Sequence, residues 1–259
     1  MRLKLVRGVL VLCLLLAAGV VVFAQRGGGF GSFFGSYSSN PKYDGKFSFI
    51  RMSYPAGGRG NAANYPAWSH DYPLGEQHFM SILTNVSNVN AHVNESSIVS
   101  FGDPEMFKNP VIYLCEPGYW RLAENEVDAL RAYFLKGGFM IVDDFPNWAW
   151  ANFETEMSRV FPQGKWVDLD VNHAIFHSFF EIKSLHVPMP YDHGTMSDDP
   201  PFRAMFEDND PTKRMYVIAN YETDISEFWE WSGTGRYIVD ENNEAYKFGV
   251  NEFVYGITH

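Results

Sequence analysis

Apolar and polar positions alternate with two different periods from residue 46 onward. Short apolar or alternating runs predict β-strands, and apolar residues spaced by three and four positions predict amphipathic helices. The predicted strands cover residues 47–52, 89–101 (one or two strands), 111–115, 139–142 and 215–219. The predicted helices lie around residues 79–86, 127–134, 153–161 and 246–257. Residues 185–212 are dense in Pro and Asp and are expected to form a loop.

The clearest unit runs from residue 111 to residue 142. The apolar run VIYLC precedes a helical stripe made by Val127, Leu130 and Phe134, and the apolar run FMIV follows it. Gly137 and Gly138 end the helix, because glycine readily takes the left-handed conformation of a helix terminus. A crossover of this length makes the two strands parallel. The repeated alternation predicts an α/β fold, with a doubly wound, mainly parallel sheet between helices.

The first 24 residues have the pattern of a secretory signal. Arg2, Lys4 and Arg7 form a basic head, and an apolar run continues from there to Ala24. The run is shorter than the roughly 17–25 residues that a membrane helix needs. We therefore expect a cleaved signal peptide over residues 1–24, with an uncleaved membrane anchor as the alternative. Both interpretations predict an exported protein, periplasmic or extracellular.

The remaining chain divides by composition. Residues 25–45 are rich in Gly, Ser and Phe without any period, which is typical of a tether, and residues 46–259 are expected to form one domain. Of the two cysteines, Cys13 lies in the predicted signal, so no disulfide is expected within the domain. Cys115 ends an apolar run and is expected to be a buried strand residue rather than a nucleophile.

The balance of charge restricts the partners. The net charge is −11, and removal of residues 1–24 would take away three basic residues and no acid. Such a surface repels phosphate backbones and anionic lipid headgroups, which argues against nucleic-acid binding and against membrane contact except through an uncleaved signal. Cations, glycans and envelope proteins remain as expected partners.

Acidic and aromatic residues directly follow three of the predicted strands. Ligands of open α/β sheets bind beyond the carboxyl ends of the strands, so these residues are the candidate ligand-binding set. The set is Glu116, Tyr119, Trp120, Asp143, Asp144, Trp148, Trp150 and Asp224. Carboxylates there suit a divalent cation or acid–base chemistry, and aromatic faces beside acids suit sugar rings. The alternative is that the acids cap helices and the tryptophans cover the core.

Histidines provide a second candidate. His173 and His177 would share one face of a helical turn, and together with Asp143 and Asp144 they are the candidate metal ligands. The alternative is a structural turn that seats apolar neighbours. His70 and Asp71 form only a contact candidate, because adjacency along the chain does not by itself make a dyad. Zinc-protease, phosphate-loop and G-x-S-x-G motifs are absent from the sequence.

Four segments together resemble the bacterial domain-of-unknown-function family 4159. They are the run FIRMSY at 49–54, Trp68 with the DYP that begins at Asp71, the run LRAYFLKGG at 130–138 before Asp143-Asp144-Phe145, and the GVN at 249–251 with Tyr255. The resemblance extends over roughly residues 47–257. It implies a class I glutamine-amidotransferase-like superfold, a flavodoxin-like sheet with helices on both faces that is also used by ThuA-like domains.

The same resemblance bears on catalysis. Residues 170–175, DVNHAI, are similar to the D-x-x-H-P-I turn of such domains, with Ala174 in place of proline. In amidotransferases a strand ends in a catalytic cysteine where this chain carries Asp143 and Asp144. The resemblance therefore implies no glutaminase nucleophile, and a fold alone implies no activity.

Three functions remain under consideration. The first is an exported, non-amidotransferase domain of the cell envelope or periplasm that binds a glycan or a cation at the acidic edge. The second is a carboxylate- or metal-dependent hydrolase that acts on a glycan or an ester. The third is a structural partner of a membrane-bound complex.

Overall fold

The structure is a computed structural model that describes residues 39–55, 66–187, 190 and 202–259. The predicted signal peptide and residues 25–38 of the predicted tether lie outside this part of the chain. Among the described residues, no helix is both long enough and apolar enough to cross a membrane.

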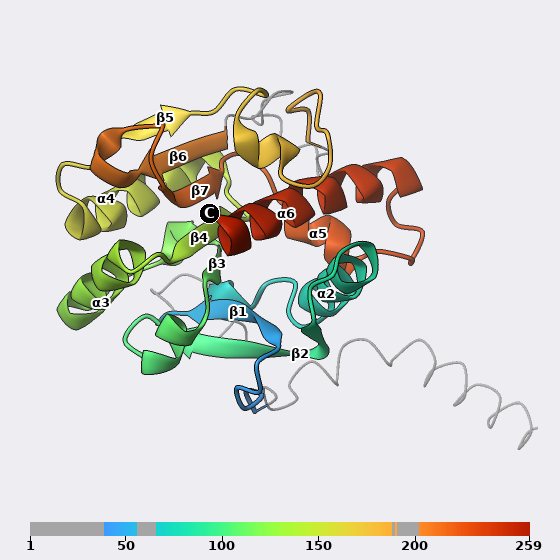
Figure 1. The fold of residues 1–259 in the computed structure, drawn as a ribbon, viewed down its shortest axis with the longest axis horizontal. Coiled ribbons are helices and arrows are strands. Elements are labelled where there is room, and N and C mark those ends of the chain that lie inside the picture. The colour runs from blue at the N-terminus through green and yellow to red at the C-terminus, as the bar shows by residue number, and fades with distance from the viewer. Residues whose placement is uncertain (1–38, 56–65, 188–189, 191–201) are drawn as a thin grey trace, which may run out of the picture. The chain divides into compact units, whose positions relative to one another are not determined.

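Seven strands form one sheet in the described part of the chain (Figure 1). The strands are β1 (Phe47–Ser53), β2 (Ala91–Ser100), β3 (Val111–Cys115), β4 (Phe139–Asp143), β5 (Trp166–Asp168), β6 (Phe202–Phe206) and β7 (Met215–Asn220). Their order across the sheet is β2-β1-β3-β4-β7-β6-β5. The strands from β2 to β7 in this order are parallel, whereas β6 is antiparallel to both of its neighbours. The α/β class and the mostly parallel sheet are therefore confirmed.

Helices cover both faces of this sheet. The α-helices are α2 (Leu74–Val86), α3 (Glu124–Leu135), α4 (Trp150–Val160), α5 (Ile225–Glu230) and α6 (Val239–Thr258). The short 3-10 turns are η1 (Ala67–Ser69), η2 (Pro104–Lys108), η3 (Pro117–Tyr119), η4 (Asn147–Ala149), η5 (Ala174–His177) and η6 (Glu207–Asn209). Helices α2, α5 and α6 share one apolar core with the sheet, and α3 and α4 share the other.

Strand β1 shows how the sequence divides its side chains between these two cores. Phe49 belongs to the core under α2 and α6, whereas Ile50 and Met52 belong to the core under α3 and α4. This alternation is the period of two expected of a strand that is buried on both faces. Arg51 takes a position on the Phe49 side, although it is a charged residue, and it is 1% exposed.

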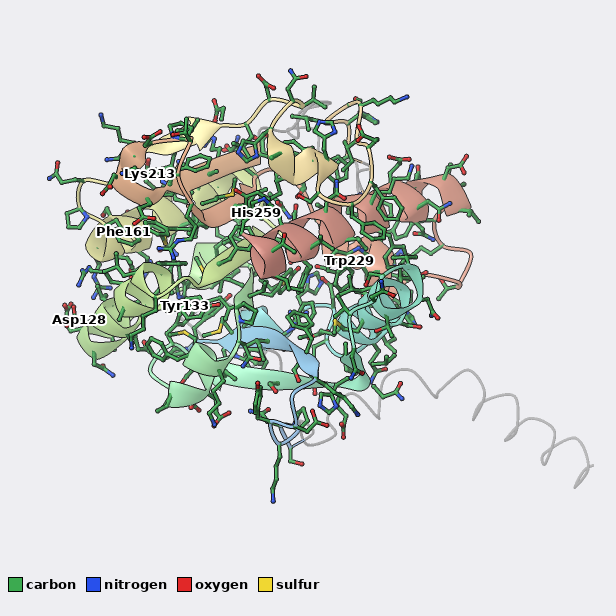
Figure 2. The ribbon with its side chains drawn as sticks, viewed as in Figure 1. Asp128, Tyr133, Phe161, Lys213, Trp229 and His259 are labelled. Carbon is green, nitrogen blue, oxygen red and sulfur yellow. The ribbon has the colours of Figure 1, made fainter. Side chains whose placement is uncertain are left out.

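Helix α5 packs against both α2 and α6 through Trp229, which is labelled in Figure 2. The ring of Trp229 lies 4.4 Å from that of Phe79 in α2, measured between centroids. It also lies against Gly249 of α6, where a Cβ would approach the ring to 2.3 Å. Glycine at this position therefore allows α6 to pack closely on α5. This packing holds α5 against α2 and α6, and the helix begins shortly after β7, at the carboxyl edge of the sheet.

The far end of the sheet departs from the sequence prediction. Residues 202–206 form strand β6, so the prediction of a loop through residues 185–212 was wrong there. Strand β5 and helix α5 were also not predicted, because β5 has three residues and α5 has six, too few to show a period.

Candidate functional site

The order of the strands indicates where a ligand would bind. Strand β2 lies on one side of β1, and the next strand along the chain, β3, lies on the other side of β1. Ligands of doubly wound sheets bind beyond the carboxyl ends of the strands at such a reversal. The segments that follow β1, β3 and β4 meet at this place. The first carries His70 and Asp71, the second Glu116 and the third Asp144. We call these four residues the edge site.

His70 is the centre of the edge site. Its Nδ1 lies 2.6 Å from Asp144 Oδ2, 3.8 Å from Asp71 Oδ1 and 3.9 Å from Glu116 Oε1. The side chain of His70 is 42% exposed, so the site opens to solvent on this side. Burial opposes the charged imidazolium, but the carboxylates of Asp71 and Asp144 outweigh this effect and raise the pKa of His70.

Two of the acids hold protons more tightly than carboxyl groups in water. Burial, together with the charge of Asp144, raises the pKa of Asp71 to about 7, and the same causes raise the pKa of Glu116 to about 8. Both values arise because several negative charges occupy a small, poorly solvated volume. A bound cation would relieve this repulsion, since an added positive charge favours the ionised carboxylates.

The backbone of the edge site is unusual as well. Asp71, Glu116 and Asp144 have φ values of 61°, 49° and 54°, in the left-handed region that residues with side chains rarely adopt. Such conformations cost about 1–3 kcal/mol each and concentrate at functional sites. Three of the four residues of the edge site therefore have a strained backbone.

Arg51 holds the loop that carries His70. Its guanidinium donates to the carbonyl oxygens of Trp68 and His70, at 2.9 and 2.8 Å, and forms a buried ion pair with Glu76 of α2. The sequence signal for this role was a charged residue at position 51, among the large apolar residues Phe49, Ile50 and Met52 of a predicted strand. Tyr54 in the same way holds the loop that follows β3.

The Tyr54 hydroxyl donates to the carbonyl oxygens of Cys115 and Glu116, at 2.9 and 2.7 Å. It therefore fixes the turn at the end of β3. Arg51 and Tyr54 of the FIRMSY segment thus hold two loops of the edge site, the loop after β1 and the loop after β3.

Asp143 is a buried support of the site rather than an open ligand. Its oxygens accept hydrogen bonds from the Tyr113 hydroxyl at 3.0 Å and from the backbone N–H groups of Ile225 and Ser226 at 3.3 and 2.9 Å. Ser226 also donates from its hydroxyl to Asp71 Oδ2. Asp143 therefore positions the start of α5, and through Ser226 it supports Asp71.

Asp224, another candidate, caps α5. Its Oδ1 accepts a hydrogen bond from the backbone N–H of Glu227 at 3.2 Å, and the side chain is buried. This geometry agrees with the alternative interpretation of the acids as helix caps.

The predicted aromatic residues lie in different environments. Trp148 is 55% exposed and meets the ring of Tyr119 edge-on, at 5.2 Å between centroids. Its ring lies against Gly118, two residues after Glu116 of the edge site. Trp120 is buried between Phe101 and Phe153. Trp150 is the first residue of α4, and Arg203 covers its ring. Of the four predicted aromatic residues, Trp148 is therefore the exposed one, and Tyr119 packs against it.

The structure does not bring the predicted histidine pair to the edge site. His173 accepts a hydrogen bond from the backbone N–H of Ile175 at the start of η5. His177 pairs with Glu181 at 3.0 Å and with the carbonyl oxygen of Val171 at 2.8 Å. Neither residue is in a metal-ligand grouping among the described residues.

Three groupings within the described residues have the spacing to hold a metal ion. They are His70 with Glu116 and Asp144, His70 with Asp71 and Cys115, and Asp71 with Glu227 and Glu230. In the third, one oxygen of Glu227 is already shared by Arg236 and the Tyr237 hydroxyl, at 3.1 and 2.8 Å. The first two groupings share His70, which the sequence marked only as a contact candidate.

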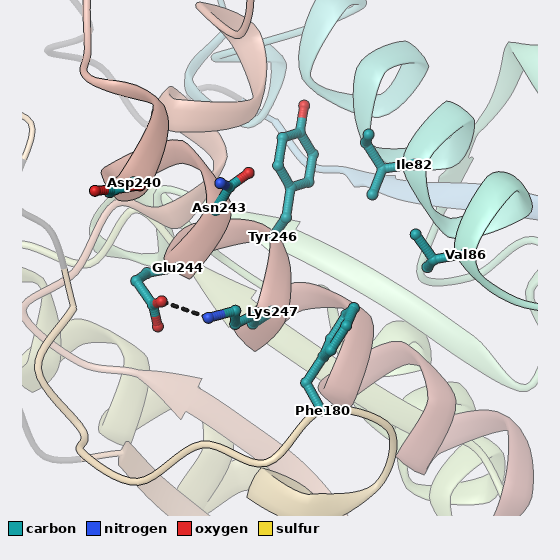
Figure 3. A pocket seen from close by; sticks show the side chains of 8 residues that line it. All are labelled: Ile82, Val86, Phe180, Asp240, Asn243, Glu244, Tyr246 and Lys247. Atoms are coloured by element: carbon teal, nitrogen blue, oxygen red, sulfur yellow. Dashed lines mark hydrogen bonds and ion pairs between the residues drawn. The ribbon is translucent and has the colours of Figure 1, made fainter.

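A surface pocket elsewhere contains none of the predicted site residues. It has a volume of about 390 Å³ and lies between α2, α6 and the segment that carries Phe180 (Figure 3). Apolar side chains of Ile82 and Val86 face an ion pair between Glu244 and Lys247, at 2.5 Å. The titratable residues of the edge site therefore lie outside this pocket.

The part of the chain that matches a known family includes all four residues of the edge site. A family model described as a domain of unknown function (DUF4159) matches residues 57–257. No curated protein matches the chain.

Proposed function

Because the chain belongs to the family described as a domain of unknown function (DUF4159), a description that assigns no activity, we propose its function from the chemistry of the edge site. The domain binds a divalent transition-metal cation there. The observation that carries this proposal is the convergence of three carboxylate oxygens on one imidazole nitrogen, all within 3.9 Å. An imidazole among carboxylates suits Zn²⁺ or Mn²⁺ better than Ca²⁺, which takes oxygen ligands.

A second observation supports a cation at this place. Among the residues that the structure describes, none forms a hydrogen bond with Asp71 Oδ1. The Asp71 side chain is fully buried, and this oxygen faces His70. An unsatisfied buried polar atom costs about 1–3 kcal/mol, more when it is charged. A cation would satisfy Asp71 Oδ1 and neutralise the crowded acids at the same time.

Thermal unfolding of the full chain tests the proposal. Melts are recorded in chelator and then with Zn²⁺, Mn²⁺, Mg²⁺ or Ca²⁺ added separately. A cation at about 100 times its dissociation constant stabilises the native state by ~2.7 kcal/mol, which is about 5–10 °C in a domain of this size. The shift is expected with Zn²⁺ or Mn²⁺, and it should disappear in His70→Gln.

The matched control is His177→Gln, which removes another histidine that is paired with a carboxylate. This variant should keep the full shift. The absence of a shift with every cation, or an equal shift in His70→Gln, would refute the cation site.

A glycan is the second candidate ligand, and the exposed ring of Trp148 favours it. Trp148 and Tyr119 form an aromatic surface next to Glu116, whose carboxyl group would hydrogen-bond to sugar hydroxyls. Titration with oligosaccharides should change the tryptophan fluorescence of the full chain and of Phe107→Ala, which loses an exposed ring elsewhere. Trp148→Ala should bind no sugar if this candidate is right.

Hydrolysis is the alternative activity of the same site. The pKa values of Asp71 and Glu116, about 7 and about 8, are close to those of effective general acids and bases at neutral pH. Turnover of glycan or ester substrates that is lost in a folded Glu116→Gln variant would support this alternative. Cys115 does not support glutaminase chemistry, because it is buried and burial raises the pKa of its thiol.

The relationship to amidotransferase-like domains remains part of the proposal. The strand order β2-β1-β3-β4-β7 supports it, since it corresponds to the 2-1-3-4-5 order of flavodoxin-like sheets. We also propose export to the periplasm or cell envelope on the pattern of residues 1–24. Cell fractionation of the full chain and of a variant without residues 1–24 tests export, and an unchanged location would contradict it.

A further inference from the structure

Cys115 borders both the apolar core and the edge site. It is the last residue of β3, it is 0% exposed, and it belongs to the core under α2, α5 and α6. Its Sγ nevertheless lies 3.7 Å from Asp144 Oδ2. The thiol is therefore shielded from solvent but adjacent to the polar groups of the site.

The thiol belongs to a compact set of three different donor atoms. A nitrogen of His70, an oxygen of Asp71 and the sulfur of Cys115 all lie within 4.8 Å of one another. The other grouping, His70 with Glu116 and Asp144, is more exposed and shares the imidazole. His70 thus stands between an inner, buried grouping and an outer, half-buried one.

The inner grouping contains the unsatisfied oxygen of the site. Ser226 fixes Asp71 Oδ2 by its hydrogen bond, so Oδ1 is held in place, and no group in the described part of the chain donates a hydrogen bond to it. It lies 3.8 Å from His70 Nδ1. An ion bound between His70, Asp71 and Cys115 would give this oxygen a direct ligand bond, where the described residues offer only the longer ion-pair contact with His70.

We infer that Cys115 is a ligand of the bound cation, and that the edge site is therefore built for a thiophilic dication, with Zn²⁺ as the natural choice. This inference rests on the proposed cation site and names the metal. Zn²⁺ takes sulfur, imidazole nitrogen and carboxylate oxygen together, whereas Mg²⁺ and Ca²⁺ take oxygen ligands. On binding, the thiol releases its proton to solvent and the thiolate sulfur bonds to the metal.

Co²⁺ is the probe that tests the inference, because it reports its ligands by absorption. The metal-free full chain is titrated with Co²⁺ under reducing conditions in a Cys13→Ser background, which removes the chain's other thiol. A thiolate ligand produces a sulfur-to-cobalt charge-transfer band in the near ultraviolet, beside the visible d–d bands. Both features are expected, and Cys115→Ser should lose only the charge-transfer band.

Zinc provides the second measurement. X-ray absorption of the Zn²⁺-loaded protein should show one sulfur at about 2.3 Å and nitrogen or oxygen ligands at about 2.0–2.2 Å. Cys115→Ser should weaken Zn²⁺ binding by at least about tenfold, the lower end of what loss of a supporting second-shell group costs. The wild-type spectra decide the question even if this variant folds poorly.

The outcomes separate the inference from the function it rests on. Visible d–d bands without a charge-transfer band, or a zinc shell without sulfur, would overturn the role of Cys115 and leave the cation site standing. Complete absence of Co²⁺ and Zn²⁺ binding would overturn both.

Discussion

His70 Nδ1 and Asp144 Oδ2 lie 2.6 Å apart, although 74 positions separate these residues along the chain. The contact joins the loop after β1 to the end of β4, across the strand β3 that lies between them. Around this pair, buried acids hold their protons and the imidazole holds its charge. The charge of Asp144 therefore adds to the effect of burial in raising the pKa values of Asp71 and Glu116.

Removal of the Asp144 charge should lower the pKa of His70. Asp144→Asn keeps the shape of the side chain but removes one of the carboxylates that favour the imidazolium. The measurement is an NMR titration of the histidine ring protons in wild type and variant. The ring protons of His177 serve as the internal reference, and an unmoved His70 titration would contradict the assigned ion pair.

Stability of the metal-free protein should fall as the pH rises from about 5 to about 8. Asp71 and Glu116 have native pKa values of about 7 and about 8, above the ordinary values of 3.8 and 4.5. The native state therefore holds protons that the unfolded chain has already released. The free energy of unfolding decreases by up to about 1.4 kcal/mol per pH unit for each such proton.

His70, whose pKa is also raised, acts in the same direction above its ordinary value of 6.5. Urea denaturation in chelator at several pH values measures the slope. Asp71→Asn should flatten the slope between pH 5 and 7, and a slope equal to that of wild type would count against the buried acid. Metal binding should show the opposite trend and strengthen over this range, because the acids must lose their protons to bind.

Loss of Arg51 should strongly destabilise the fold. Arg51→Leu leaves Glu76 as an unpaired buried charge and releases the backbone of Trp68 and His70. Breaking a buried ion pair in this way costs about 3–5 kcal/mol. The control is Lys213→Ala, which breaks an exposed pair with Asp208 and should cost at most about 1 kcal/mol. Urea unfolding that shows equal losses in both variants would contradict the role of Arg51.

Gly118 should be required for the position of Trp148. A Cβ at residue 118 would lie 2.3 Å from the Trp148 ring and 2.9 Å from the Ala149 side chain. Gly118→Ala should displace the ring, change the tryptophan emission and cost about 1–3 kcal/mol. The double variant Gly118→Ala/Trp148→Ala should recover part of this loss, and a loss that is additive would argue against the contact.

The central strands were predictable because their signal is local. The runs VIYLC, FMIV and MYVIA are apolar at every position, as strands buried on both faces must be. β6 was not predictable in the same way, since it follows a segment dense in Pro and Asp. The acids after β3 and β4 were also found, because the rule on carboxyl ends depends only on where a strand stops.

His70 and Asp71 could not be placed by that rule. They lie well beyond the end of β1, and tertiary contacts hold their loop at the sheet edge. These contacts are the hydrogen bonds from Arg51, the pairing of His70 with Asp144 and the hydrogen bond from Ser226 to Asp71. Nor does the sequence distinguish Trp148 from Trp120. Both follow a predicted strand by a few residues, and the turn geometry alone exposes one and buries the other.

The left-handed backbone at Glu116 has a consequence for how such a protein changes under selection. Glycine would adopt a φ of 49° without strain, and Glu116→Gly would also remove a crowded carboxyl group. A laboratory selection for heat resistance alone should therefore enrich glycine at this position. Selection for the native role should keep the acid instead. The difference in free energy of unfolding between Glu116→Gly and wild type would then measure how much stability is lost to keep that carboxylate.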